Sequence, residues 1–247
     1  MPKKSATKPK RFIAVSCSHG HLADPNLLAQ VCDFAAKFKA ERRIHLGDWC
    51  DLAAMRNGAG GTNDEAESIT QDLKAGFQFL ADYQATDIFF GNHEIRVFRF
   101  LHSHNAVKSY AAGQLLGQFQ EFSRQLGART YMDYHIQRPS CRLVLGDTMF
   151  LHGFMFNETA TRDHAEWAQM QVVHGHTHRP DISKARTLGS HLGYSVGALC
   201  NTPNMDYPAA RRQTSAWGAA VAYGEFTNKE CKVWMEIEKN GKFQFPI

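Results

Sequence analysis

The sequence predicts an α/β fold in which two packed sheets are flanked by helices. In the first half of the chain, short apolar runs suited to buried strands alternate with longer stretches of helical periodicity, as in a mainly parallel sheet. In the second half, closely spaced apolar runs separated by turn residues favour hairpins. A parallel sheet followed by hairpins is the order expected when two sheets pack face to face.

The first half supplies three strands and two helices in alternation. RFIAV at 11–15 predicts a strand, and Pro25 marks the start of the helix that follows. RRIHLGD at 42–48 predicts the second strand, the segment 65–84 predicts the second helix, and TDIFFGNHE at 86–94 predicts the third strand with its exit. This alternation brings the carboxyl ends of the strands to one edge of the sheet.

A helical insertion is expected at about 95–127, because no strand-like run interrupts its helical periodicity. Beyond it, the segment 141–153 predicts two short strands, 158–169 a helix, and 172–178 a strand that runs into a loop. The tail predicts hairpins, since Asn240-Gly241 between alternating residues is typical of a type I′ turn.

We expect a single domain over residues 12–247, preceded by a flexible basic leader over 1–11. The 247 residues contain no internal repeat, and 43% apolar with 21% charged residues is typical of a globular protein. No run approaches the roughly 18 apolar residues of a membrane span, and six cysteines without CxxC pairs favour reduced thiols. A cytoplasmic location without a membrane partner is expected. The basic leader leaves room for a weak contact with nucleic acid.

Five short motifs end apolar runs, at the positions where open α/β sheets gather their ligands. Because alternate residues of a strand share a face, Cys17 and His19 are expected to reach one ion, and His176 and His178 repeat that spacing. Thiolate, imidazole, carboxylate and amide oxygen are all competent metal ligands. Each motif alone is a weak signal, but the ordered set is specific. The motifs are Cys17-Ser18-His19, GDWCD at 47–51, GNHE at 91–94, LHG at 151–153 and GHTH at 175–178.

The order of these motifs resembles the pattern D-x-H, G-D-x-x-D, G-N-H-[DE], H and G-H-x-H of the calcineurin-like metallophosphoesterases. The resemblance runs from about residue 12 to the end, although the helical insertion and the tail carry little of it. It implies a four-layer α/β/β/α sandwich with two divalent metal ions at the strand ends. It further implies two ligand sets that share Asp48: Cys17, His19, Asp48 and His178 around the first ion, and Asp48, Asn92, His152 and His176 around the second.

The resemblance also implies roles for residues that bind no metal. His93 would be the catalytic histidine beside the scissile phosphate, and Asp51 would orient its neighbours from behind the ligands. Physical chemistry suits these roles, because two adjacent cations need a shared anion such as the Asp48 carboxylate, and an imidazole can protonate a leaving alkoxide near pH 7.

Cys17 departs from the pattern, which has aspartate at this position. A thiolate is softer than a carboxylate, so the first site should favour zinc or iron over magnesium. Manganese, zinc and iron are the ions we expect overall. The alternative is a buried thiol with the first ion weakly bound or absent. The intact His19, Asp48 and His178 favour ligation.

The function expected from the resemblance is hydrolysis of phosphoester bonds by a metal-bound hydroxide, with His93 as the general acid. Phosphodiesters of DNA, RNA or nucleotides are the favoured substrates. A phosphomonoesterase or protein phosphatase on the same core is one alternative, and a non-catalytic metal-binding interaction scaffold is another. The sequence leaves the oligomeric state open.

Several other residues have a structural explanation beside, or in place of, a functional one. Arg96 and Arg99, one helical turn apart, would meet a substrate phosphate or form surface ion pairs, and the sequence does not decide between these. His45, His174 and Trp49 are expected in the packed core.

Overall fold

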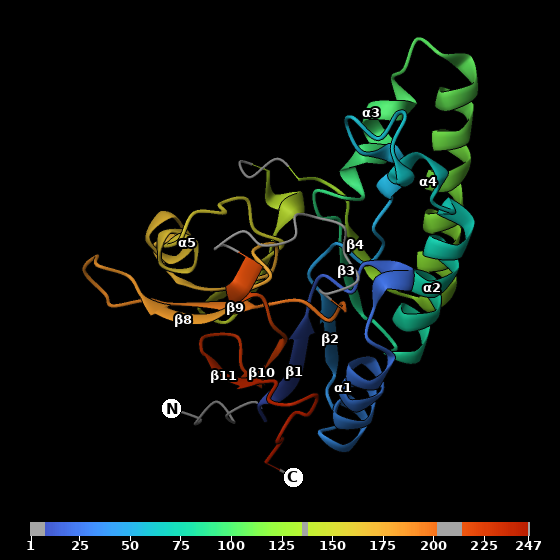
Figure 1. Cartoon of the computed structure of the whole chain (residues 1–247). Helices are drawn as coiled ribbons and strands as arrows, with labels where there is room; N and C mark the ends of the chain where they lie inside the picture. The colour runs from blue at the N-terminus through green and yellow to red at the C-terminus, as the bar shows by residue number, and fades with distance from the viewer. Residues whose placement is uncertain (1–7, 135–137, 202–213, 247) are drawn as a thin grey trace, which may run out of the picture.

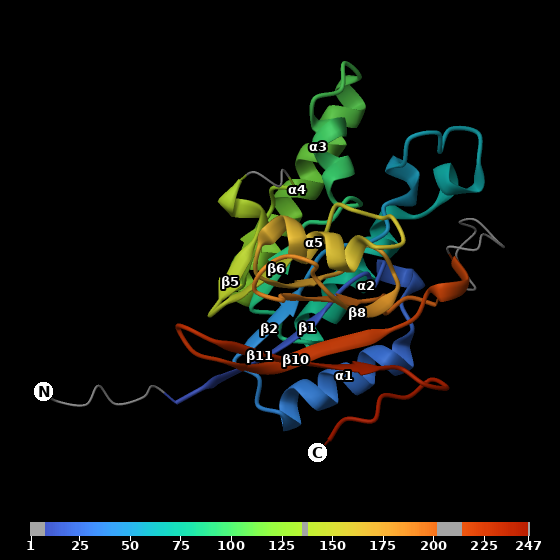
Figure 2. The same ribbon diagram turned by 90° about the vertical axis from the view of Figure 1, so that its left-hand side faces the viewer.

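The computed structural model describes residues 8–134, 138–201 and 214–246. In this part of the chain, two mixed sheets pack together and helices cover their outer faces (Figures 1 and 2). The α/β fold class predicted from the sequence is therefore confirmed. The predicted leader lies largely outside the described residues, and its last two members, Lys10 and Arg11, belong to the first strand, where they pair with Phe226 and Glu225.

The first sheet has six strands in the order β11-β10-β1-β2-β3-β4 within the described ranges. The pairs from β1 to β4 are parallel, and β10 and β11 add an antiparallel hairpin beside β1. Its strands are β1 (Lys10–Val15), β2 (Arg42–His45), β3 (Asp87–Phe89), β4 (Arg129–Tyr131), β10 (Ala220–Phe226) and β11 (Cys231–Ile237).

The second sheet has five strands in the order β5-β6-β7-β9-β8, again counted over the described residues. β7 is parallel to both β6 and β9, and antiparallel strands close the sheet on either side. Its strands are β5 (Leu143–Leu145), β6 (Thr148–Leu151), β7 (Gln171–His174), β8 (Pro180–Lys184) and β9 (Leu192–Val196). The parallel strands β1, β2, β3, β6 and β7 are the ones that end in the five motifs.

Helices α1, α2 and α4 start where the sequence supplies side-chain caps. The α-helices of the described residues are α1 (Pro25–Lys37), α2 (Ile69–Asp82), α3 (Ile95–Leu101), α4 (Ala106–Leu126) and α5 (Ala160–Ala168). The Asp24 carboxylate accepts two backbone N–H groups at the start of α1, with Pro25 in the first turn. Ser68 caps α2, so this helix begins four residues later than predicted. Gly127 ends α4 with a φ of 70°.

Three apolar clusters define four layers. Ile13 and Val15 of β1 face α1 and α2, whereas Phe12 and Ala14 face the second sheet. Between the sheets, the rings of Phe12 and Phe150 meet edge to face at 5.1 Å. On the outer face of the second sheet, strand residues such as Leu151 pack near α5. The order helix, sheet, sheet, helix matches the sandwich that the resemblance implies.

Helices α3 and α4 occupy the predicted insertion, and α4 rises well beyond the sheets (Figures 1 and 2). Trp49, in the loop after β2, packs between this region and the core. Its ring stacks on Phe119 of α4 at 5.0 Å and on Phe77 of α2 at 5.5 Å. Trp49 is buried, as predicted, together with His45 and His174.

The predicted turn at Asn240-Gly241 is present, with positive φ at both residues (55° and 75°) and pairing between Lys239 and Lys242. No helix in the described ranges combines the length and apolarity needed to cross a membrane.

His164 of α5 anchors the chain that follows β6. Its Nδ1–H donates to the Ala160 carbonyl at 2.7 Å, so Nε2 accepts the backbone N–H groups of Phe154 and Met155 at 3.0 and 3.4 Å. Its ring stacks on His174 at 4.2 Å. Burial lowers the pKa of His164 to about 4, against weaker opposing effects of the Ala160 carbonyl and Asp163. The ring is therefore neutral in the folded protein at pH 7.

This shift predicts acid destabilisation. As the pH falls, His164 takes up a proton near its ordinary pKa of 6.5 in the unfolded chain, but only near pH 4 in the folded chain. Stability should therefore fall between these values, by about 2 kcal/mol from pH 7 to pH 5 for this one group. Urea unfolding with chelator present, at pH 7 and pH 5, measures the change. His164→Gln, which takes up no proton, should show a smaller pH dependence. An identical dependence in the variant would contradict the assignment.

Candidate metal centre

Backbone hydrogen bonds join four of the five motif loops, in two pairs, at the carboxyl ends of the strands. The loop after β1 is joined to the loop after β2, because Cys17 N–H donates to the Gly47 carbonyl and His19 N–H to the Asp48 carbonyl, both at 3.0 Å. The loops after β6 and β7 are joined by Gly175 N–H, which donates to the His152 carbonyl at 2.9 Å. Residues distant in sequence are thereby held at fixed separations before any ligand binds.

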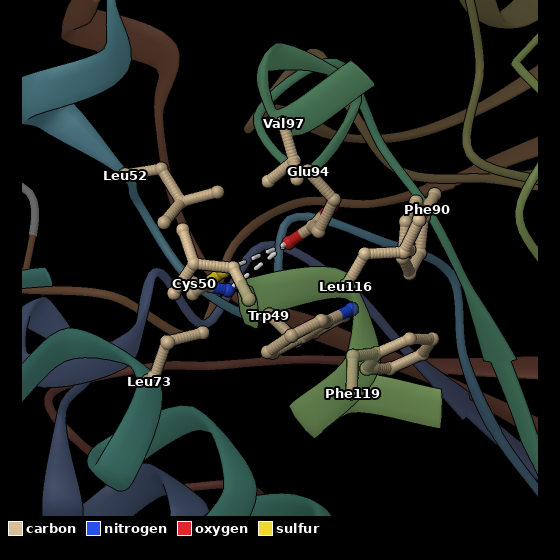
Figure 3. Close-up of a pocket in the computed structure, with 10 residues that line it drawn as sticks. Trp49, Cys50, Leu52, Leu73, Phe90, Glu94, Val97, Leu116 and Phe119 are labelled. Carbon is tan, nitrogen blue, oxygen red and sulfur yellow. Dashed lines mark hydrogen bonds between the residues drawn. The ribbon is translucent and has the colours of Figure 1, made fainter. Parts of the chain in front are cut away.

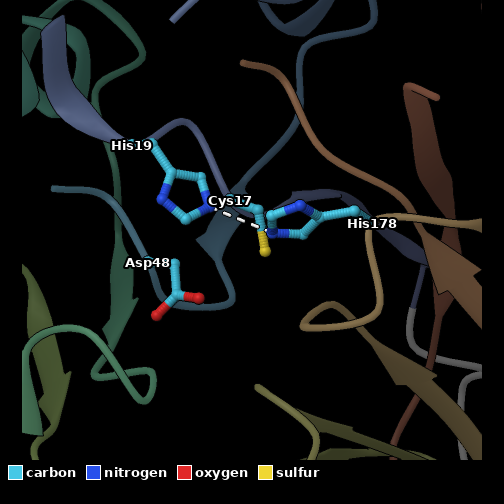
Figure 4. A group of neighbouring side chains, drawn as sticks. All are labelled: Cys17, His19, Asp48 and His178. Carbon is cyan, nitrogen blue, oxygen red and sulfur yellow. Dashed lines mark hydrogen bonds between the residues drawn. The ribbon is translucent and has the colours of Figure 1, made fainter. Parts of the chain in front are cut away.

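The first group of side chains contains Cys17, His19, Asp48 and His178, and it is buried. One ligand atom from each residue lies within 4.8 Å of the others. The Nε2 atoms of His19 and His178 are 3.0 Å apart. Figure 4 shows the sulfur, the carboxylate and the two rings gathered around one space. The structure thus brings together all four residues that the resemblance implies for the first ion.

The second group shares Asp48 with the first. Asp48 Oδ2 lies 3.3 Å from His152 Nε2, and the group of Asp48, His152 and His176 also meets the 4.8 Å criterion. Asn92 Oδ1 lies 3.1 Å from His152 Nε2 and 2.8 Å from His176 Nδ1. All four residues implied for the second ion are therefore neighbours, and Asp48 stands between the two groups.

The hydrogen-bond pattern suits cations rather than a purely hydrogen-bonded core. His152 donates its Nδ1 proton to the Leu46 carbonyl at 2.8 Å, which leaves the Nε2 lone pair facing the oxygens of Asp48 and Asn92. Such a contact requires a second proton on the ring or a cation between the atoms. His19 donates Nδ1–H to Asp51 at 2.8 Å, so its Nε2 lone pair also points into the cluster. The donor set fits a pair of metal ions.

The backbone at the site is strained. Among the described residues, eleven non-glycine residues have positive φ. Five of these are members of the two groups: Cys17, His19, Asp48, His176 and His178, with φ between 52° and 68°. Left-handed backbone at ordinary residues is disfavoured and clusters at functional sites.

This strain also corrects the expected reason for the i, i+2 spacing. β1 ends at Val15 and β7 at His174, so Cys17, His19, His176 and His178 lie beyond the strands. Left-handed turns, not strand alternation, aim these side chains. Consequently His178 joins the first group while His176 joins the second.

Glycines permit the close approach of the loops. A Cβ on Gly91 would collide with the Asp48 carboxylate and lie 2.6 Å from His152 Cε1. A Cβ on Gly175 would collide with Ser16 and lie 3.6 Å from Cys17 Sγ. Both glycines belong to the motifs. A side chain at Gly91 would displace members of the second group, and one at Gly175 would displace Ser16, the neighbour of Cys17.

His93 lies beside both groups. Its Nδ1–H donates to the Asp51 carbonyl at 2.7 Å, and Asp51 Oδ1 is 3.2 Å from the same nitrogen. Its Nε2 is 3.9 Å from Asp48 Oδ2. Asp51 therefore contacts both His19 and His93 through hydrogen bonds that use their Nδ1 protons. The cluster of His19, Asp51 and His93 is better explained as this network than as a third ion site.

The two arginines of α3 differ in environment. Arg96 is buried; its Nη1 donates to the carbonyls of Asp51 and Leu52 at 2.7 and 3.2 Å, and its Nη2 lies 3.3 Å from His93 Nε2. Surface ion pairing is therefore wrong for Arg96. Arg99 is exposed on the same helix. Contact of either arginine with a substrate phosphate stays a prediction.

Glu94 is a buried carboxylate whose role the sequence reasoning missed. Its oxygens accept the backbone N–H groups of Gly91, Asp48 and Cys50 at 2.7, 3.0 and 3.1 Å. Figure 3 shows the contact with Cys50. Burial, followed by the charge of Asp48, raises the pKa of Glu94 to about 7. The residue clamps the loop after β2 to the loop after β3. The sequence feature that could have identified Glu94 is its position at the end of the GNHE motif.

Asp72 of α2, also missed, supports the same loop from the other side. Its carboxylate accepts the N–H groups of Asp51 and Leu52, the shortest contact being 2.7 Å to Leu52. Within a helical segment of mixed polarity, this aspartate carried no distinguishing pattern.

A small cavity of about 20 Å³ lies behind the loop after β2 (Figure 3). Apolar side chains such as Leu73, Phe90 and Leu116 line it together with Glu94. Its size suits about one water molecule, far below the several hundred Å³ of a substrate pocket. It is a packing defect beneath α4 rather than a substrate site.

Burial and neighbouring charges shift the pKa values of several residues at the site. Burial opposes ionisation of Asp48, but His152, His93 and His19 hold its pKa well below the usual range. Burial lowers the pKa of His176 to about 3, so its imidazole is neutral and able to bind a metal at pH 7. Burial and the Asp48 charge raise the pKa of the Cys17 thiol well above its usual value. Ligation by Cys17 therefore requires a cation to displace the thiol proton.

Comparisons with known proteins show likenesses of fold. No family model matches the chain, and the search of curated proteins found no match. Among solved structures, Vacuolar Protein Sorting 29 from Cryptosporidium parvum aligns at 10% identity and a TM-score of 0.49, over 96% of this chain and 95% of that one. A predicted phosphoesterase from Streptococcus pneumoniae TIGR4 aligns at 16% identity and 0.37, over 94% and 91%. YfcE, a phosphoesterase from E. coli, aligns at 13% and 0.40, over 86% and 87%.

The close approach at Gly91 yields a prediction. Gly91→Ala should lower the free energy of unfolding by about 1–3 kcal/mol, because the methyl group displaces Asp48 and His152. Metal bound per chain should fall as well. Chemical denaturation and metal analysis measure the two effects.

Gly117→Ala is the matched control. Gly117 lies on the exposed face of α4, where an added Cβ meets nothing within 4 Å. This change should leave metal content intact and be neutral or stabilising by up to about 1 kcal/mol. Equal behaviour of the two variants would show that the approach at Gly91 does not hold the site.

Proposed function

We propose that this protein is a metal-dependent phosphoesterase with a dinuclear centre. The observation that carries the proposal is the pair of side-chain groups that share the single buried carboxylate of Asp48, with His93 beside them. The first ion would be held by Cys17, His19, Asp48 and His178, and the second by Asp48, Asn92, His152 and His176. Manganese, zinc and iron suit these donors.

When bound, two such ions supply an activated water and neutralise the charge that develops on phosphoryl oxygens. The chain's own residues prepare the site for this chemistry. The loops fix the separation of the two groups, and Asp48 provides the anion that two neighbouring cations require. Asn92 contributes an uncharged ligand, which limits the negative charge that a phosphate anion would meet.

His93 is suited to proton transfer at Nε2. The Asp51 carbonyl holds the Nδ1 proton, which fixes the orientation of the ring and leaves Nε2 between the Arg96 guanidinium and the shared carboxylate, at 3.3 and 3.9 Å. Burial and the Arg96 charge act to lower the pKa of His93, but the Asp48 charge and the Asp51 contact outweigh them and raise it to about 9. In its protonated state Nε2 would donate to the leaving alkoxide.

For the substrate, we favour phosphodiesters, including those of DNA, RNA or nucleotides. The basic segment at the start of the sequence and the helices α3 and α4, which follow His93 directly, support this choice. Phosphomonoesters and phosphoproteins are the competing substrates on the same core. Turnover of bis-p-nitrophenyl phosphate against its monoester separates the two classes.

His93→Asn should reduce kcat by about 10²–10⁴-fold while leaving the metal content unchanged. The reduction should be larger for diesters with poor alkoxide leaving groups than for p-nitrophenyl esters, because a good leaving group needs little protonation. Steady-state kinetics over a series of leaving groups, with metal analysis of each preparation, measures both effects.

His104→Asn, in an exposed position after α3, is the control and should keep full activity. Equal loss for all leaving groups would contradict a general-acid role for His93. A protein that binds divalent metal ions and hydrolyses none of these esters would instead support the metal-binding interaction scaffold.

A further inference from the structure

The two groups offer different chemistry to a metal ion, and the difference originates at Cys17. The first group contains one sulfur, two imidazole nitrogens and one carboxylate oxygen. The second contains only nitrogen and oxygen donors, one of them the Asn92 amide. Sulfur donors select softer ions such as zinc and ferrous iron, whereas oxygen-rich sets accept manganese and magnesium. The ligand sets are therefore unequal in softness.

The surroundings of the Cys17 sulfur suit a bound thiolate. The Ser16 hydroxyl lies 3.1 Å from Sγ, and both this hydroxyl and the backbone of His176 act to lower the pKa of the thiol, against burial and the Asp48 charge. Its other side packs in a small apolar cluster with Ala198 and Cys200. Hydrogen bonds to sulfur stabilise its anionic form, and an apolar wall keeps water from competing for the ion.

The first group also has the form of a closed site. Its four residues are between 0% and 4% exposed, and four is the number of ligands that structural zinc takes in a tetrahedral arrangement. The 3.0 Å between the nitrogens of His19 and His178 is close to the roughly 3.3 Å expected for two imidazoles on one tetrahedral zinc. With all four positions taken by protein, no position is left for substrate.

The second group is more open. Asn92 and His176 are both partly exposed, and His93, which is not a ligand, stands beside the shared carboxylate. An ion that prefers six ligands would have two positions beyond the four protein donors. Those positions are the ones that solvent and a phosphoryl oxygen could reach.

We propose that the centre is built to hold two different metal ions. A soft ion of the zinc class is held permanently by Cys17, His19, Asp48 and His178. A harder, exchangeable ion is held by Asp48, Asn92, His152 and His176, and it carries the coordination positions that are open to solvent and substrate. The inference rests on the proposed function for the ligand sets and goes beyond it in assigning unequal roles to the two ions.

Cobalt(II) tests the assignment without reference to activity. Apoprotein titrated with Co²⁺ should show, within the first equivalent, a sulfur-to-cobalt charge-transfer band and the intense visible absorption of a tetrahedral ion. The second equivalent should add only weak absorption. A first equivalent without the charge-transfer band, with two ions still bound, would overturn the proposal and leave the dinuclear phosphoesterase standing.

Metal exchange provides the second readout. Protein loaded with one equivalent each of Zn²⁺ and Mn²⁺ and briefly exposed to a mild chelator should retain about one zinc per chain and lose the manganese. Loss of both ions at the same rate would overturn the proposal. Failure to bind any ion would overturn both this inference and the proposed function, so the two failures are distinguishable.

Cys17→Asp restores the pattern of the resemblance and isolates the effect of sulfur. The variant should still bind two ions but lack the charge-transfer band, and its preference for zinc over manganese in the first site should fall on the order of 10- to 100-fold. Cys200→Ser, a neighbouring change outside the ligand set, should keep the band and the preference. Unchanged selectivity in Cys17→Asp would count against a thiolate ligand.

Discussion

The candidate metal centre depends on one buried carboxylate that its two groups of side chains share. Asp48 belongs to both groups, and the backbone around it is fixed from several directions. Glu94 accepts the Asp48 N–H, while Asp48 Oδ1 accepts the N–H of His93 at 3.0 Å. The position of the shared anion is therefore set by hydrogen bonds that join the loops after β2 and β3, and these loops follow neighbouring parallel strands.

Holding the ligands in this way strains the backbone, and metal binding offers an offsetting stabilisation. A left-handed conformation costs roughly 1–2 kcal/mol for an ordinary residue, so the five residues at the site together cost on the order of 5–10 kcal/mol. That is comparable to the whole stability of a typical domain, about 5–15 kcal/mol. A structural zinc ion contributes about 10–16 kcal/mol in small metal-dependent folds. The packed sheets must therefore support the site until ions bind, and bound ions should raise stability markedly.

Much of this arrangement was accessible from the sequence, and the exceptions share a physical cause. The strand–helix alternation, the Asn240-Gly241 turn and the order of the motifs are local patterns, so they predicted the sheets and the identity of the clustered side chains. Strand alternation was the wrong reason for the spacing of Cys17 and His19. Both residues lie in a loop with left-handed backbone, and such a conformation leaves no periodic pattern in the sequence. Glu94, Asp72 and the buried position of Arg96 were missed because their partners are backbone groups of other loops, which composition and spacing do not reveal.

The substitution at position 17 changes softness while conserving charge. A thiolate and a carboxylate each carry one negative charge, so two divalent cations meet the same formal charge from Asp48 and residue 17 in either case. In the proposed dinuclear centre, the excess of two positive charges over Asp48 and residue 17, which would attract a phosphoester anion, is therefore the same with either residue. Glu94, Asp72 and Asp51, whose carboxylates accept N–H groups of the protein, contribute the same charge in either case. In the proposed enzyme, cysteine at this position would therefore alter which ion is held without altering the electrostatic attraction for substrate, and that would separate metal selectivity from substrate binding.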